Sequence, residues 1–189
     1  MNIETLSYTD RECLLDRLRG GVFHLTTRDA YEAIQKAGEI SNNKSARFPL
    51  NTSSQNSLGR LLGCVCLFDL RNDTPEVIQN TLECYYFLGP TWFARHEDDC
   101  IVWDLAYLFL SPEYYDLIIP NSEVHDYYKK TGKYLHAIPA SEVWVKDKIP
   151  LSWIEKVFLV TIREPAPDRT TPAGMHYWAV LKAHEGKQR

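Results

Sequence analysis

The chain has 189 residues, of which 44% are apolar and 24% are charged. This length and composition fit one globular domain with a sizeable core, and they exclude a disordered or fibrous chain. The formal net charge of −4 argues against a protein that attracts nucleic acid broadly and nonspecifically.

Cysteine use and hydropathy indicate a reducing compartment. The five cysteines are an odd number and lack the spacing of a disulfide framework. The first residues, "MNIETLSYTD", lack the basic and apolar regions of a signal peptide, and no uncharged run approaches the ~18 residues of a membrane span. We therefore expect an intracellular, cytoplasmic protein without a membrane partner.

The first predicted elements are a short helix, a strand and a longer helix. A capping-box pattern at residues 9–12 predicts a helix that the glycine pair at 20–21 ends. Residues 22–25 predict the first strand, and His24 lies near its end. Thr27 then caps a helix with one apolar face, which ends at Gly38.

The stretch "SNNKSARFPLNTSSQNS", residues 41–57, has no periodicity and is rich in Asn and Ser. A loop of this length inside a compact domain is commonly functional or poorly ordered. Because it begins soon after the helix, we predict that it forms a lid over the site that His24 faces.

The rest of the chain mixes helices and strands without a regular alternation, which favours the α+β class and a single domain over residues 1–189. The predicted strands are 64–70, 84–89, 101–110, 141–147 and 156–162, with a last strand or helix over 176–183. The predicted helices run from Thr74-Pro75 to about Leu82, from Ser111-Pro112 onward, and from about Glu123 to Lys130.

Several kinds of site are disfavoured by the sequence. It contains no glycine-rich phosphate loop. The pair Cys64-x-Cys66 lies in a buried-type strand without a second pair, so we interpret it as core rather than as a zinc site, and we expect no metal. The acidic run at 96–99 reads as the solvated tip of a hairpin. A small basic cluster, Lys129, Lys130 and Lys133, is typical of a solvated helix end.

Two segments together resemble a known family. The stretch "HLTTRDAYEAIQKAGEI" resembles the opening strand and helix of the ADP-ribosyltransferase fold, especially its DNA ADP-ribosyltransferase toxin (DarT-type) branch. The matching residues are His24, Leu25, Thr26, Ile34, Gly38 and Ile40. The later stretch "IPASEVWVKDKIPLSWIEKVFL", 138–159, looks like the part of that fold in which a glutamate begins a strand, and Glu142 occupies that position.

This resemblance implies an α+β fold with mixed, mostly antiparallel sheets and peripheral helices, and it implies NAD as a substrate. Glu142 would stabilise the oxocarbenium-like transition state and serve as a base. His24 and the Leu25–Thr26 step would hold the ribose and the nicotinamide. A tyrosine of the site would be Tyr31, with Tyr85 and Tyr86 as alternatives.

An arginine is also expected, to pair with the pyrophosphate or to assist catalysis. Arg60 is assigned to the catalytic set and Arg47 to the cofactor, although their positions along the chain do not separate them.

The resemblance implies transfer of ADP-ribose to a macromolecule, either nucleic acid or protein. An acceptor strand of nucleic acid would use the basic cluster and exposed aromatics such as Trp92. A toxin of this branch would also have an inhibitor (antitoxin) protein as a partner. Two alternatives stay open: an NAD-dependent RNA 2'-phosphotransferase, and a non-catalytic binding module that retains the fold.

Overall fold

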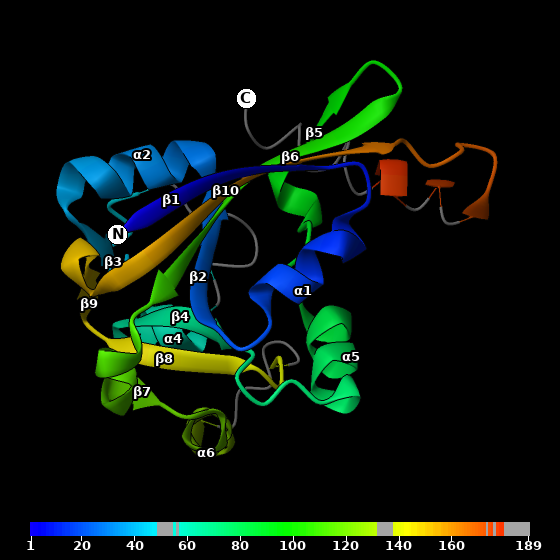
Figure 1. The fold of residues 1–189 in the computed structure, drawn as a ribbon. Coiled ribbons are helices and arrows are strands. Elements are labelled where there is room, and N and C mark those ends of the chain that lie inside the picture. The colour runs from blue at the N-terminus through cyan, green and yellow to red at the C-terminus, as the bar shows by residue number, and fades with distance from the viewer. Residues whose placement is uncertain (49–54, 56, 132–137, 173, 176, 180–189) are drawn as a thin grey trace.

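The computed structural model describes residues 1–48, 55, 57–131, 138–172, 174–175 and 177–179 (Figure 1). An eight-stranded sheet dominates the fold, in the order β1-β10-β6-β2-β4-β8-β7 with β5 paired to β6. The strands are β1 (Asn2–Tyr8), β2 (Val22–Thr27), β4 (Cys64–Asp69), β5 (Ala94–Glu97), β6 (Cys100–Leu110), β7 (Ile118–Ile119), β8 (Glu142–Lys146) and β10 (Ile154–Pro165). Neighbouring strands are antiparallel except for β1 and β10, which are parallel.

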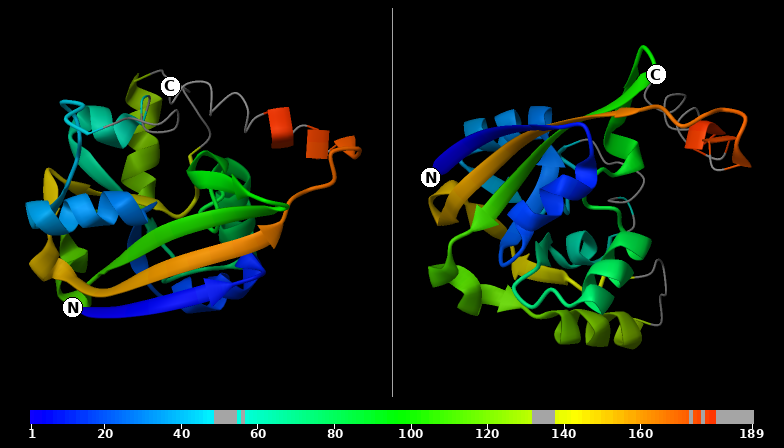
Figure 2. Two further views of the ribbon diagram at one scale, coloured as in Figure 1. Left: turned by 90° about the horizontal axis from the view of Figure 1, so that it is seen from above. Right: turned by 45° about the vertical axis from the view of Figure 1, so that its right-hand side comes forward.

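Helices cover both faces of this sheet (Figures 1 and 2). The α-helices are α1 (Leu15–Leu18), α2 (Arg28–Ala37), α4 (Leu58–Leu62), α5 (Pro75–Cys84) and α6 (Asn121–Thr131). The 3-10 helices are η1 (Arg11–Leu14), η2 (Thr91–Phe93), η3 (Pro112–Leu117) and η4 (Leu151–Trp153). A second, two-stranded sheet joins β3 (Glu39–Ser41) to β9 (Lys148–Pro150).

Three apolar clusters form the core. On one face of the sheet, η1, α1 and α5 pack on Phe23, Tyr107 and other residues of the central strands. On the opposite face α2 packs on Val22, Leu108 and the valines of β8. A smaller cluster lies on the first face, where α4 and α6 cover Trp144. Burial of these side chains supplies the main driving force for the fold.

Local signals set the ends of the predicted helices. The Thr27 hydroxyl accepts a hydrogen bond from the Ala30 amide at 3.2 Å, and Gly38 ends α2 with a φ of 75°. Thr74 caps α5 in the same way, with Pro75 in the first turn. In the first helical segment the cap is Asp10 rather than Thr9, because the Asp10 carboxylate accepts the Glu12 amide at 2.9 Å.

The α+β class and the mostly antiparallel sheet are confirmed, and the strands predicted at 22–25, 64–70, 101–110, 141–147 and 156–162 are present. The strand predicted at 84–89 is wrong. Cys84 is the last residue of α5, and residues 85–89 join no sheet. Phe87 and Leu88 in this run are fully buried, because the run fills the core rather than a strand ladder.

Some strands were not predicted, namely β1, β3, β5, β7 and β9. The edge strand β1 lacks an alternating apolar pattern, and the others are short. Of the segment predicted at 176–183, residues 177–179 are helical and the remainder lies outside the described residues. No helix in the described ranges is long and apolar enough to cross a membrane.

Candidate functional site

The large sheet splits where His24 lies. Strand β2 pairs with β4 only at Val22 and Phe23, whereas it stays paired with β6 from Phe23 to Thr27. The split therefore leaves the main chain of residues 24–27 without β4 as a neighbour on that side. A ligand that enters such a split can form hydrogen bonds with backbone groups that the neighbouring strand does not pair.

His24 bridges the two strands at the split. Its Nδ1 lies 2.9 Å from the main-chain oxygen of Cys66 on β4, so Nδ1 carries the proton and donates it to that carbonyl. Burial lowers the pKa of His24 below its ordinary value, and the bond to Cys66 opposes the shift. The imidazole is therefore neutral at neutral pH, and its Nε2 is a hydrogen-bond acceptor.

Glu142, the first residue of β8, is half-buried and held by two donors. The indole Nε1–H of Trp144 donates to Glu142 Oε1 at 2.7 Å, and the Cys66 thiol also donates to the carboxylate. Burial raises the pKa of Glu142, while these two hydrogen bonds lower it. Within the described part of the chain its charge is thus met by neutral donors rather than by Lys or Arg.

Cys66 connects the two residues that the sequence selected separately. Its carbonyl binds His24, its thiol binds Glu142, and its Sγ lies 3.5 Å from Ser57 Oγ. Burial and the nearby Glu142 raise the pKa of the thiol far above its ordinary value. Cys66 therefore acts as a donor and not as a nucleophile. The sequence interpretation had placed this residue in the core alone.

Aromatic side chains line the site beside Glu142. Burial raises the pKa of Tyr85, and the nearby Cys66 and Glu142 raise it further. The Tyr85 ring packs on Phe68 and, edge to face, on Trp92, with both ring centroids at 5.1 Å. Tyr85 was one alternative for the tyrosine of the site, in a run that was predicted as a strand.

Gly59 on α4 allows the helix to approach the site closely. A Cβ atom at this position would lie 2.6 Å from Cys66 Sγ and 2.8 Å from Trp144 Nε1. Both of these atoms belong to groups that hold Glu142. The sequence offered no signal for Gly59, because its role depends on a contact between separate elements.

Tyr31 is not part of this cluster. It is 2% exposed in the core on the face of the sheet opposite to Glu142, and its hydroxyl accepts a hydrogen bond from Gln35 at 3.0 Å. Leu25 and Thr26 are both buried, so their side chains do not reach a ligand in the split. Successive residues of a strand direct their main-chain groups to opposite sides, so the Leu25 main chain faces the split and the Thr26 main chain faces β6.

Arg47 lies on the polar segment 41–57 that was predicted as a lid, and Arg60 lies on α4, which follows that segment. The Arg60 guanidinium donates to the carbonyls of Asn43, Lys44 and Gln55 at 3.3, 3.1 and 2.8 Å. It therefore ties the two ends of the 41–57 segment together. Arg47 is exposed and stands 5.5 Å from the Phe48 ring centroid. Residues 49–54 and 56 of the predicted lid lie outside the described residues.

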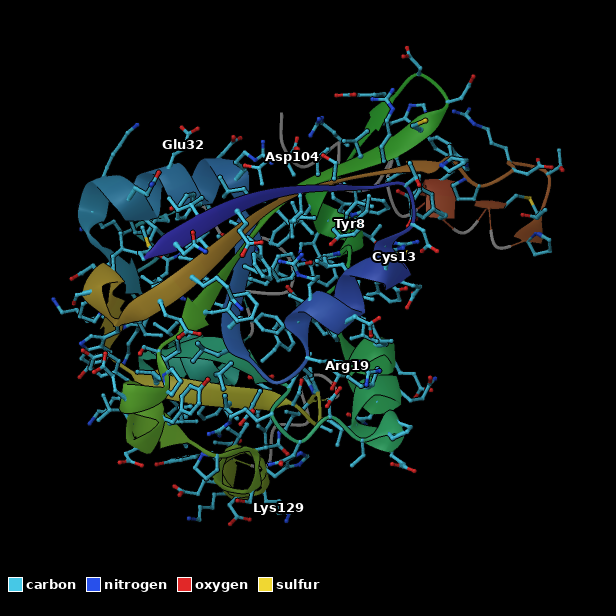
Figure 3. The ribbon with its side chains drawn as sticks, in the orientation of Figure 1. Tyr8, Cys13, Arg19, Glu32, Asp104 and Lys129 are labelled. Carbon is cyan, nitrogen blue, oxygen red and sulfur yellow. The ribbon has the colours of Figure 1, made fainter. Side chains whose placement is uncertain are left out.

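The remaining candidates are on the surface. Asp98 and Asp99 form the predicted hairpin turn between β5 and β6, and Glu97 at the end of β5 pairs with Arg95 and Arg163. Lys129 pairs with Asp126 at the end of α6, labelled in Figure 3, and Lys133 lies outside the described residues. The described residues hold no group of three His, Cys, Asp or Glu side chains placed to bind a metal ion.

Comparisons with protein-family models, with curated proteins and with solved structures each found no match.

Proposed function

We propose that the protein cleaves the nicotinamide–ribose bond of NAD at the split between β2 and β4 and transfers ADP-ribose to a macromolecular acceptor. One observation carries the proposal: a half-buried carboxylate, Glu142, is held by neutral donors beside that split. A buried carboxylate without a cationic partner is stabilised by a ligand that brings positive charge.

NAD cleavage supplies such a charge at the reacting centre. The C1'–N bond breaks, its electron pair leaves with nicotinamide, and the ribose passes through an oxocarbenium-like transition state. The acceptor then bonds to C1' and gives up a proton. Glu142 stabilises the developing charge, and its raised pKa suits it to accept that proton.

The neighbouring groups complete the proposed NAD site. His24 Nε2 accepts a ribose hydroxyl, since Nδ1 is committed to Cys66. The main chain of Leu25, which faces the split where β4 no longer pairs with β2, binds the nicotinamide amide. Arg47 pairs with the pyrophosphate, because it is exposed, while Arg60 orders the segment that carries it.

Nicotinamide release by the purified protein tests this proposal, with labelled NAD and separate DNA, RNA and protein acceptors. Glu142→Gln keeps an oxygen that can accept the Trp144 bond but removes the charge, so we expect at least about a 100-fold loss of the rate. The control, Glu83→Gln, changes an exposed carboxylate on α5 and should leave the rate unchanged. Equal rates for wild type and Glu142→Gln would refute the mechanism.

The other functions give different results in the same assays. A binding module would bind NAD in calorimetry without releasing nicotinamide from any mixture. An RNA 2'-phosphotransferase would consume NAD only with a 2'-phosphorylated RNA. Either result would replace ADP-ribosyl transfer as the function.

A further inference from the structure

Among the residues that the structure describes, the large sheet has one long open edge. Strand β1 has seven residues, pairs with β10 on one side and is the outermost strand of the sheet order. Figure 2, left, shows no described segment beyond it. An open edge presents a row of unpaired N–H and C=O groups that can pair with a strand of another chain.

The other edges are blunted in ways that β1 is not. At the opposite edge β7 has only two residues, Ile118–Ile119. The hairpin edge β5 carries the ion pair of Arg95 and Glu97. In contrast, β1 has no proline or lysine and only one charged residue, Glu4. Short length and several charges are the usual protections against edge-to-edge pairing, whereas β1 is longer than β5 and β7 and carries a single charge.

We propose that β1 pairs antiparallel with β1 of a second copy of this chain, about a two-fold axis that passes beside Thr5. A two-fold axis requires a self-complementary surface. With Thr5 opposite Thr5, all seven residues pair, and Glu4 of each copy faces Leu6 of the other. The single charge therefore never opposes itself, and Arg17 already neutralises it at 2.5 Å.

The side chains of β1 also fit this register. Thr5 is exposed on the face that also carries Ile3, which is 46% exposed. In the dimer each Ile3 lies opposite Ser7 and diagonal to Thr5 of the other copy, where it loses contact with water. A single strand pair buries less than the roughly 1,600 Å² of a standard interface, so the dimer is in equilibrium with monomer.

Sedimentation over a range of protein concentrations tests the dimer. Wild type should shift from monomer to dimer as concentration rises. Thr5→Lys places two like charges on the axis and should raise the dimer Kd at least about tenfold. Thr5→Val keeps the shape without charge and should still dimerise. A wild type that stays monomeric throughout, or a Thr5→Lys variant with unchanged Kd, would overturn the proposal.

Cross-linking tests the register, and circular dichroism with thermal melting checks that every variant is folded. Exposed Cys13, labelled in Figure 3, is first replaced by Ser. Directly opposite residues have Cα atoms about 4.5–5.5 Å apart, within the disulfide range. Thr5→Cys in this background should therefore form an oxidised dimer, whereas Ser7→Cys should not. Equal cross-linking of both variants, or of neither, would overturn the register.

Discussion

The hydrogen bond from Trp144 to Glu142 gives the sharpest test of the proposed site. Trp144→Phe removes the Nε1–H donor that lies 2.7 Å from Glu142 Oε1. A hydrogen bond to a charged group contributes about 1.5–3 kcal/mol, and a neutral one about 0.5–1.5 kcal/mol. Since Trp144 is fully buried, the smaller ring also leaves a cavity, which adds to the loss.

A double-mutant cycle with Glu142→Gln separates the bond from the cavity. The cavity is common to both backgrounds, so it cancels, and the coupling reports the charged part of the bond. From the values above we expect a coupling of about 1 kcal/mol at neutral pH. For a chain of this length each 1 kcal/mol moves Tm by about 2–4 °C, which denaturant and thermal unfolding both resolve.

The pH dependence makes the test specific to Glu142. Its pKa is raised in the folded protein, so the folded state binds the proton more strongly than the unfolded state, and stability falls as pH rises through the interval between the two pKa values. Loss of the Trp144 donor raises this pKa further. Trp144→Phe should therefore lower the free energy of unfolding more at about pH 8 than at about pH 4. Equal losses at both pH values, or an additive cycle, would refute the reasoning.

Further predictions concern the groups around this bond. Gly59→Ala should destabilise the protein by about 1–3 kcal/mol and slow nicotinamide release, because its Cβ would overlap Cys66 Sγ; normal Tm and rate would contradict this. The lowered pKa of His24 means that stability declines as pH falls below 6.5. His24→Gln should flatten that part of the Tm–pH profile, and an unaltered slope would count against a neutral buried His24. Arg60→Ala should speed amide hydrogen exchange in residues 42–48 but not in β6, as followed by mass spectrometry.

Much of the fold could be predicted from local sequence. The Thr27 cap and the Gly38 stop fix α2, and the strand patterns at 22–25 and 101–110 fix two central strands. Such signals involve residues that are close in the sequence, so they can be recognised without knowledge of the tertiary structure. The edge strand β1 escaped prediction because half-exposed edge residues need no alternating apolar pattern.

The sequence by itself determined the residue types of the candidate site, with a histidine on an early strand and a glutamate opening a late one. Only the tertiary structure decided how they meet. Cys66 links His24 to Glu142 through its carbonyl and its thiol. Tyr31 lies in the core on the opposite face of the sheet. Tyr85, which belongs to the run predicted as a strand, lies at the site near Cys66 and Glu142. These placements depend on pairing between segments distant in the chain, which periodicity within one segment does not encode.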